Sequence, residues 1–247
     1  MDGTVGVVLA AGRGTRLRPL TRLRPKALCP VGNVPLVDLA LERVRPAVDA
    51  VAVNLHHGRR TLDRHLPDDV HRSVEDQELL GTAGALGQLR AWIDGRATLV
   101  VNADAWCPGS MAPFAEGWDG ERIRLLIPGG DELQPDSRIA GALMPWRDVA
   151  ALEPVPSGLF EASWRAAQTA GRVEVVRHEG PFVDCGTARQ YLEANLLANG
   201  GESVVEPGAV VEGTLDRCVV WSDARVHAGE SLTCCIRARG GLTVLAR

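Results

Sequence analysis

The sequence of 247 residues has almost no lysine, no long apolar run and no excess of positive charge. Lys26 is the only lysine among 27 basic residues, and every other one is arginine. The net charge of −4 argues against a nucleic-acid partner, because nucleic-acid-binding surfaces are strongly basic. No apolar run approaches the roughly 18 residues of a membrane helix, and no basic segment at the start leads into an apolar one. We therefore expect neither a membrane partner nor a secretory signal.

The six cysteines form no C-x-x-C pair and lack the spacing of zinc ligands. Without an export signal, this predicts reduced thiols in a cytoplasmic protein. The hydrophobic fraction of 45% and the charged fraction of 23% are typical of a folded globular protein. A coding preference for arginine explains the composition. It does not explain the survival of Lys26, unless that position needs a compact ammonium group.

Short valine-rich runs alternate with segments of helical periodicity up to residue 201. This alternation predicts an α/β domain over residues 1–201, with a Rossmann-like, doubly wound, mainly parallel sheet. Asn33 is a possible cap of the first helix, and Thr187 and Gln190 have the spacing of a capping box. The expected strands cover residues 5–11, 51–54, 97–104, 124–127, 139–144 and 181–184, and the expected helices cover residues 36–48, 82–93, 159–170 and 188–198.

Residues 202–247 have a different pattern, which predicts a separate C-terminal tail. Apolar side chains recur in it at a spacing of six: Val205 and Val211, then Val220, Val226 and Leu232. This hexapeptide spacing predicts turns of a left-handed parallel β-helix, although the phase breaks at Arg217 and ordinary antiparallel strands are an alternative. Fewer than three coils are not stable alone. We therefore expect the tail to pack on the main domain or on another subunit, as in a homo-oligomer.

A glycine-rich loop follows the first expected strand, at the edge of the sheet where ligands bind. Gly12 and Gly14 allow a sharp turn, and the free N–H groups of such a turn can bind an anion. The loop is not a P-loop, and Leu17 at the third glycine position excludes the dinucleotide fingerprint. Arg16 and Lys26 follow closely in the sequence. Together these features fit a triphosphate better than the alternative, a simple tight turn.

Four segments, in order along the chain, resemble the sugar-1-phosphate nucleotidyltransferases. The resemblance is strongest to the mannose-1-phosphate guanylyltransferase and N-acetylmuramate-1-phosphate uridylyltransferase branches. LAAGRGTRLRPLT at 9–21, with RPK at 24–26, resembles the family signature, and LGTAGAL at 80–86 resembles the nucleoside-side loop. VVNAD at 100–104 and FVDCGT at 182–187 resemble the two metal-carboxylate motifs. The tail is similar to the C-terminal β-helix of the family.

The resemblance implies transfer of a nucleoside monophosphate from an NTP to a sugar 1-phosphate, with release of pyrophosphate. The attacking phosphate is already an anion near pH 7, so the reaction needs cations and a metal rather than a base. The implied catalytic residues are Arg16 at the β- and γ-phosphates, Lys26 between the α-phosphate and the incoming phosphate, and Asp104. Asp104 and Asp184 would hold Mg²⁺, with a cap or turn as the alternative role for each. The implied nucleotide-binding loop comprises Ala10, Ala11, Gly12, Gly14, Thr15 and Arg16.

Gly81 and Thr82 are implied to open a helix that faces the nucleotide, where Gly81 would let a base or ribose approach closely. Asp76 is a candidate for reading the base edge, and a solvated acidic loop is the alternative. On the acceptor side, Gly141 matches a glycine near the sugar, and Trp106 could stack on a base or sugar ring. A strand irregularity and core packing are the alternatives for these two residues.

The acceptor side departs from the family in one respect. Many relatives hold the sugar phosphate with a second lysine, and this chain has none. Arg138 or Arg177 could substitute, because a guanidinium binds phosphate well. A cyclitol phosphate therefore stays open beside a sugar 1-phosphate. Two other functions also stay open: a non-catalytic regulatory homologue that binds a nucleotide sugar, and a cytidylyltransferase for a non-sugar phosphate.

Overall fold

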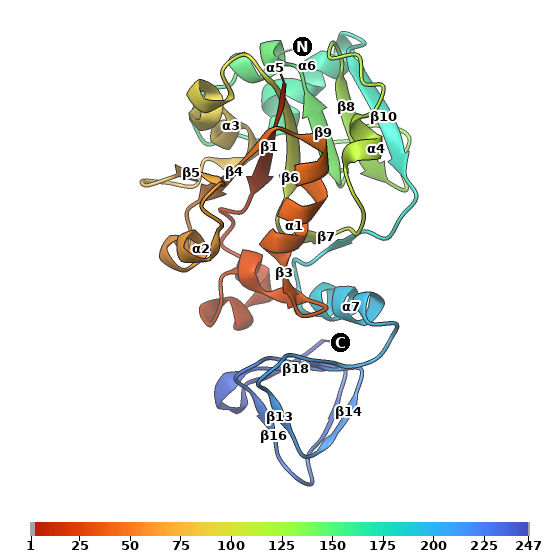
Figure 1. Ribbon diagram of the computed structural model, residues 1–247. Helices are drawn as coiled ribbons and strands as arrows, with labels where there is room; N and C mark the ends of the chain where they lie inside the picture. Colours follow the sequence, from red (N-terminus) through yellow and green to blue (C-terminus); the bar gives the residue numbers. More distant parts are fainter. Residues whose placement is uncertain (1–2, 247) are drawn as a thin grey trace. The chain divides into compact units, whose positions relative to one another are not determined.

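The computed structural model describes residues 3–246, which form two compact units (Figure 1). Unit 1 contains Met1–Gly12, Val37–Ala103 and Cys107–Phe182, and unit 2 contains Arg13–Leu36, Asp104–Trp106 and Val183–Arg247. Each unit therefore combines segments that are distant in the sequence. The division into residues 1–201 and 202–247 stays a prediction. No helix within residues 3–246 combines the length and the apolar character needed to cross a bilayer.

Unit 1 contains a seven-stranded sheet with the order β10-β8-β9-β6-β1-β4-β5. Only β9 runs antiparallel to its neighbours β6 and β8, and the other pairs are parallel. The prediction of a mixed α/β fold with a mainly parallel sheet is thus confirmed. The strands are β1 (Thr4–Leu9), β4 (Ala50–Leu55), β5 (His71–Val74), β6 (Ala97–Asn102), β8 (Ile123–Pro128), β9 (Gly141–Met144) and β10 (Val173–His178).

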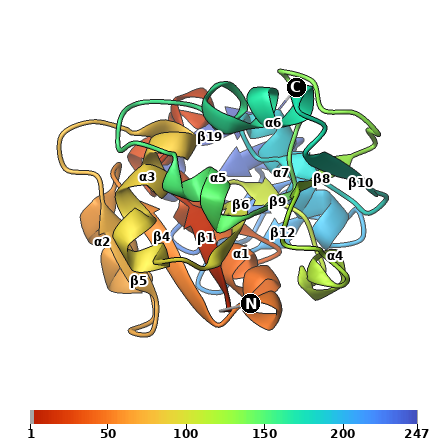
Figure 2. The same ribbon diagram turned by 90° about the horizontal axis from the view of Figure 1, so that it is seen from above.

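Helices cover both faces of this sheet. Figure 2 shows α3, α5 and α6 along one face, where Val5 and Val7 of β1 join a buried apolar cluster with Leu86 of α3. The intervening Gly6 faces α1, where any Cβ would overlap Val44 Cγ1, so the absent side chain lets that helix approach the strand. The helices are α1 (Leu36–Val44), α2 (Arg59–His65), α3 (Gly81–Ile93), α4 (Ala112–Ala115), α5 (Trp146–Ala150) and α6 (Arg165–Thr169).

Several predicted boundaries were wrong. The first helix ends at Val44 and continues as a 3₁₀ turn, Arg45–Ala47, rather than reaching residue 48. The helix expected over residues 159–170 consists of a π-helical turn, Phe160–Trp164, followed by α6. Asn33 does not cap a helix. With a φ of 67°, it lies in the turn between β2 (Pro30–Val31) and β3 (Val34–Pro35).

Unit 2 contains two further elements that matter for the site and for the tail. A short ribbon joins β7 (Ala105–Trp106) to β11 (Val183–Asp184), and helix α7 spans Ala188–Ala198. The Thr187 hydroxyl accepts a hydrogen bond from the Gln190 N–H at 3.3 Å, which confirms the predicted helix cap.

The tail of unit 2 winds as a three-sided coil of parallel strand pairs (Figure 1). The alternative of ordinary antiparallel strands is therefore wrong, except for the last strand. Val220 and Val226 are fully buried inside the coil. Val205 and Val211, in register with them, are exposed because they lie in the first coil. The strand pairs are β12 (Val204–Val205) with β15 (Val219–Val220), β15 with β18 (Cys235–Arg237), β13 (Val210–Val211) with β16 (Arg225–Val226), β14 (Thr214–Asp216) with β17 (Ser231–Thr233), and the antiparallel β18 with β19 (Thr243–Leu245).

The coil packs on the rest of unit 2, as its small size predicts. Trp221 Nε1 donates a hydrogen bond to the Tyr191 hydroxyl at 3.1 Å, and that hydroxyl donates to the Pro30 carbonyl at 2.6 Å. The Arg24 guanidinium pairs with Glu206 at 3.1 Å and lies 4.5 Å from the centre of the Trp221 ring. These contacts join the coil to α7 and to the segment that carries Lys26.

Candidate active site

In unit 2, the ribbon of β7 and β11 brings two distant aspartates together. Ala105 pairs with Asp184 across the ribbon, and the Cys185 N–H donates to the Asp104 carbonyl at 2.9 Å. Asp104 lies just beyond the end of β6, and Asp184 ends β11. The ribbon therefore places both carboxylates at one position, although they belong to separate sequence motifs.

Lys26 lies between these two carboxylates. Its side chain is only 6% exposed, and its Nζ is 2.6 Å from Asp104 Oδ2 and 3.6 Å from Asp184 Oδ1. The Arg16 guanidinium reaches Asp184 Oδ2 at 3.6 Å, with 66% of its side chain exposed. A buried charge is costly unless it is paired, and two carboxylates meet that requirement for Lys26. Four residues predicted from three separate motifs thus form one cluster of two cations and two anions.

The local sequence explains why Lys26 points into this cluster. Lys26 begins a 3₁₀ turn (Lys26–Leu28) directly after Pro25, and the Leu28 N–H donates to the Pro25 carbonyl at 2.8 Å. Gly14 has a φ of +58°, and a Cβ there would lie 3.0 Å from Lys26 Cβ. The positive φ and the short distance to Lys26 both favour glycine at position 14. The Thr21 hydroxyl then fixes the loop by donating to the Gly14 carbonyl at 2.9 Å.

The other residues of the predicted nucleotide loop have different surroundings. Ala10 and Ala11 are buried, whereas a Cβ at Gly12 would meet no atom within 4 Å. Gly12 thus has open space beside its backbone, which a ligand could use. Thr15 and Arg16 begin a 3₁₀ turn (Thr15–Leu17) after Gly14.

Two buried thiols near the charged cluster are kept neutral. Burial raises the pKa of Cys185 to about 12, and the nearby charge of Lys26 lowers it only in part. Burial likewise raises the pKa of Cys29 to about 12, against a smaller opposing effect of Arg24. Neither sulfur carries a charge at pH 7, so neither competes with the aspartates for Lys26.

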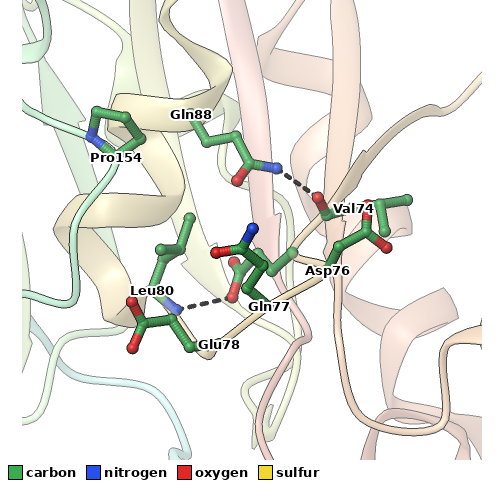
Figure 3. A pocket seen from close by; sticks show the side chains of 8 residues that line it. Val74, Asp76, Gln77, Glu78, Leu80, Gln88 and Pro154 are labelled. Atoms are coloured by element: carbon green, nitrogen blue, oxygen red, sulfur yellow. Dashed lines mark hydrogen bonds between the residues drawn. The ribbon is translucent and has the colours of Figure 1, made fainter.

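In unit 1, the loop before α3 lines a cavity of about 310 Å³. Figure 3 shows Asp76, Gln77 and Glu78 around this cavity, with Leu80 on its wall. Asp76 forms an ion pair with Arg59, and 73% of its side chain is exposed. The cavity leaves room for a planar group beside the residue expected to read a base.

Glu75 is a buried residue of this region that the sequence interpretation missed. Its side chain is almost inaccessible, at 3% exposure. Glu75 Oε1 accepts from Asn54 Nδ2 at 2.7 Å, and Oε2 accepts from the Leu80 N–H at 2.9 Å. Asn54 Oδ1 in turn accepts from the Ala10 N–H at 2.6 Å. This relay connects the end of β1 to the start of α3. An asparagine inside an otherwise apolar strand was the available sequence signal.

The structure gives Gly81 a packing reason. Its φ is +71°, and a Cβ there would lie 2.5 Å from the Ser157 carbonyl oxygen, so a segment of the chain itself occupies the space that a side chain would need. The same segment binds the start of α3: the Ala83 N–H donates to Ser157 O at 3.0 Å, and the Thr82 hydroxyl accepts from the Leu159 N–H at 2.9 Å. Thr82 and Ala83 thus both bind the segment of residues 157–159.

The acceptor-side residues also need correction. A Cβ at Gly141 would overlap Met111 Cε, so packing explains this glycine without a sugar ring. Trp106 is only 8% exposed within the ribbon, which favours packing over stacking on a ligand. Arg138 is exposed and has no ion-pair partner among residues 3–246, whereas Arg177 pairs with Asp131 and Glu179. Of the two arginines, Arg138 is therefore the freer cation.

Comparison with known proteins supports the resemblance found in the sequence. The family described as nucleotidyl transferase matches residues 5–117. The match includes Lys26 and Asp104, and the resemblance to the sugar-1-phosphate nucleotidyltransferases is confirmed.

Two relatives share one description. An N-acetylmuramate alpha-1-phosphate uridylyltransferase from Caulobacter vibrioides is 34% identical over 136 residues, which cover 50% of this chain and 56% of the relative. A protein of the same description from Neisseria meningitidis is 29% identical over 224 residues, which cover 78% of this chain and 97% of the relative. The chain thus spans little more than half of the first relative and nearly all of the second.

The fold also matches a solved structure. A structure from Thermus thermophilus described as mannose-1-phosphate geranyltransferase aligns with a TM-score of 0.71 and 20% identity, over 98% of this chain and 95% of that chain. At this identity, the likeness supports the fold alone.

Proposed function

We propose that this chain is an active nucleotidyltransferase that joins a nucleoside monophosphate from an NTP to a sugar 1-phosphate and releases pyrophosphate. The observation that carries the proposal is the cluster of Lys26 with Asp104 and Asp184. The relatives described as N-acetylmuramate alpha-1-phosphate uridylyltransferases make UTP and N-acetylmuramate 1-phosphate the first substrates to test. A cyclitol phosphate is the alternative acceptor.

In the proposed reaction, an oxygen of the sugar phosphate attacks the α-phosphorus of the NTP. A new P–O bond forms, the bond from the α-phosphorus to the bridging oxygen breaks, and its electron pair leaves with pyrophosphate. The attacking oxygen is already an anion, so no base is required. Lys26 supplies a compact positive charge to the α-phosphate and the incoming phosphate, and the exposed Arg16 binds the β- and γ-phosphates.

Asp104 and Asp184 fit a divalent metal, which we take to be Mg²⁺. Both offer hard oxygen donors at one place, as their shared contact with Lys26 indicates. Residues 3–246 contain no group of three or more His, Cys, Asp or Glu side chains that could hold a metal. Mg²⁺ commonly uses only one or two carboxylates and completes its shell with substrate phosphates and water. When bound, it polarises phosphate oxygens.

The remaining predicted residues take supporting roles in the proposal. Gly12 and Gly14 supply backbone N–H groups to the phosphates, and Asp76 contacts the base from the edge of its cavity. Arg138 is the candidate for the acceptor phosphate, because no ion pair within the described residues neutralises it. At the start of α3, the backbone N–H of Gly81 is the group that we propose contacts the nucleoside.

The tail is also part of the proposal. We take its three-sided coil to be the left-handed parallel β-helix that the hexapeptide spacing predicts, following a catalytic segment over residues 1–201. The exposed Val205 and Val211 of its first coil offer a surface for a homo-oligomer. A cytoplasmic location agrees with six free thiols, which reducing compartments maintain.

The test is pyrophosphate release with Mg²⁺, measured over a matrix of the common NTPs against N-acetylmuramate 1-phosphate, other sugar 1-phosphates and cyclitol phosphates. We expect turnover with at least one pair and its loss in Asp184→Asn. Asp223→Asn, which changes an exposed aspartate of the tail, is the matched control and should retain turnover.

A regulatory homologue is the alternative that the missing second lysine favours. It predicts no turnover with any pair, together with binding of a nucleotide sugar in calorimetry. That combination of results would replace the proposal. Turnover of a non-sugar phosphate with CTP alone would instead identify the cytidylyltransferase alternative.

A further inference from the structure

A second cavity of unit 1 contains a buried arginine with no counter-ion. The cavity has a volume of about 240 Å³. Its wall includes the polar residues Arg43, Ser110 and His178 and the apolar residues Met111 and Phe114. None of these residues belongs to the motifs of the nucleotidyltransferase resemblance.

The Arg43 guanidinium has few hydrogen-bond partners. Its residue is 6% exposed, and its Nε has no hydrogen-bond partner. Nη2 contacts only Met111 Sδ at 3.1 Å and the Ala140 carbonyl at 3.5 Å. A thioether sulfur is a weak acceptor, and 3.5 Å is long for a hydrogen bond. No carboxylate within residues 3–246 lies within ion-pair distance of Arg43.

Two other buried arginines show what the chain does when an arginine is structural. Arg124, at 8% exposure, binds Glu174 at 2.9 Å and three backbone carbonyls. Arg237, at 5% exposure, binds Glu230 at 2.6 Å. Arg43 is equally buried but has no such acid. Burial lowers the pKa of Arg43, although a guanidinium stays charged at neutral pH.

From this contrast, we propose that the Arg43 cavity is a binding site for a small organic oxyanion. An uncompensated charge next to a cavity is costly in the free protein, and an anion in that cavity would supply the missing partner. A guanidinium presents parallel N–H donors that match the two oxygens of a carboxylate or a phosphate.

The walls of the cavity restrict the rest of the ligand. Phe114, Leu126 and Val176 give it an apolar side, which suits a small planar or aliphatic body next to the anionic group. Ser110 and His178 add polar atoms on the same wall. The Ser110 hydroxyl oxygen already accepts from the Ala112 N–H at 3.0 Å, which fixes its position. The volume excludes a complete nucleotide sugar, since pockets for drug-sized ligands start at about 300 Å³.

The test uses benzoate and phenyl phosphate as probes, with benzamide as the uncharged counterpart of benzoate. In isothermal titration with the full chain, we expect benzoate or phenyl phosphate to bind and benzamide not to bind. Arg43→Met removes the charge and keeps an apolar side chain, and it should weaken binding at least about 10-fold, as expected for a charged hydrogen-bonded pair. Tighter binding of benzoate would indicate a carboxylate ligand, and tighter binding of phenyl phosphate would indicate a phosphate ligand.

Lys26→Ala is the control for the other cationic site, and it should bind the probe within twofold of the wild type. Equal binding of benzamide and of the more tightly bound anion, unchanged binding by Arg43→Met, or loss of binding in Lys26→Ala would each overturn the proposal. Because the readout is binding at Arg43 and not turnover, its failure is distinguishable from failure of the proposed nucleotidyl transfer.

A measurement of thermal stability covers the case in which Arg43→Met folds poorly. The anion that binds more tightly should raise the Tm of the wild type and of Lys26→Ala, and benzamide should not. In a buffer without oxyanions, Arg43→Met should itself raise the Tm by about 2–4 °C, because it removes an unpaired buried charge. A lower Tm for this variant in that buffer, with no anion effect on the wild type, would show that Arg43 is already compensated.

Discussion

Lys26 combines two properties that rarely occur together, burial and a charge shared between two acids. Its ammonium group is 2.6 Å from Asp104 and 3.6 Å from Asp184, with 6% of the side chain exposed. A guanidinium is broader and would need parallel acceptors in one plane. The geometry therefore explains why arginine has not replaced this lysine in a chain that otherwise uses arginine throughout.

Substitutions in this cluster test the proposed roles. Lys26→Ala and Asp104→Asn should each lower kcat at least about 100-fold, the typical effect of removing one group that stabilises a transition state. Lys26→Arg should also lower kcat, because the larger guanidinium crowds the two carboxylates. Steady-state kinetics on variants with wild-type circular dichroism gives the answer. Wild-type kcat in Lys26→Arg would remove our explanation for the single lysine.

Cys29 and Cys185 predict a loss of stability in alkali. Their pKa values are raised to about 12, from about 9 in the unfolded chain. Above pH 9 the unfolded thiols lose protons and the folded ones keep them, so the stabilisation present below pH 9 is lost as the pH rises toward 12. The expected slope is about −1.4 kcal/mol per pH unit for each thiol.

Urea unfolding at pH 7, 9 and 10 measures this slope, and Cys185→Ala should reduce it. Cys234→Ser, which changes the one cysteine that is not buried, is the matched control. A free energy of unfolding that does not fall between pH 9 and 10 would contradict the burial argument.

At the residue scale, the sequence motifs predicted Lys26, Arg16 and the two aspartates as site residues, because each lies in a short segment with a distinctive pattern. The motifs did not predict Arg43 or Glu75. These two matter through what surrounds them, and neither a missing counter-ion nor a buried relay can be recognised before the chain is folded. The packing of Met111 beside Gly141 was hidden for the same reason, because Met111 is distant from it in the sequence.

At the element scale, the hydrogen-bond relay joins β1, β4, β5 and α3. Glu75 accepts two hydrogen bonds, from Asn54 and from the Leu80 N–H. In Glu75→Gln, one side-chain oxygen becomes an NH₂ group that faces another donor. The expected loss is about 1–3 kcal/mol in the free energy of unfolding, the cost of leaving buried donors unpaired.

The double variant Asn54→Asp with Glu75→Gln restores a donor opposite an acceptor at each contact. It should recover at least half of the lost free energy, whereas Asn54→Asp alone places two carboxylates together and should also destabilise the protein. Urea midpoints of the four proteins measure the coupling. Additive effects would contradict the relay.

Elements with strong periodicity were predicted, and weakly apolar ones were missed. The core strand β1 and helix α7 agree with expectation within two residues at each end. Helix α2 was missed because Leu62 is its only buried residue, and β10 because none of its residues is buried. Their positions depend on neighbouring elements rather than on their own patterns.

At the scale of the whole molecule, the C-terminal coil supports the segment that carries Lys26. Arg24, two residues before Lys26, is held by Glu206 and by the face of Trp221. Trp221→Ala should lower the free energy of unfolding by about 3–5 kcal/mol, as for other buried large side chains, and should lower kcat without contacting substrate.

Chemical denaturation and steady-state kinetics measure these two effects. Leu197→Ala, at a side chain that is 54% exposed, is the control and should change neither. A Trp221→Ala variant that is destabilised but keeps wild-type kcat at a temperature where it is folded would show that the coil does not position Lys26.

The division of unit 2 into three chain segments also has a consequence for biosynthesis. Asp184 and the coil are made after Lys26, from which they are distant in the sequence. Domains fold during synthesis as their parts leave the ribosome. A nascent chain can therefore pair the central strands of its sheet first, whereas the ammonium group of Lys26 acquires its second acid only after residue 184 has been made.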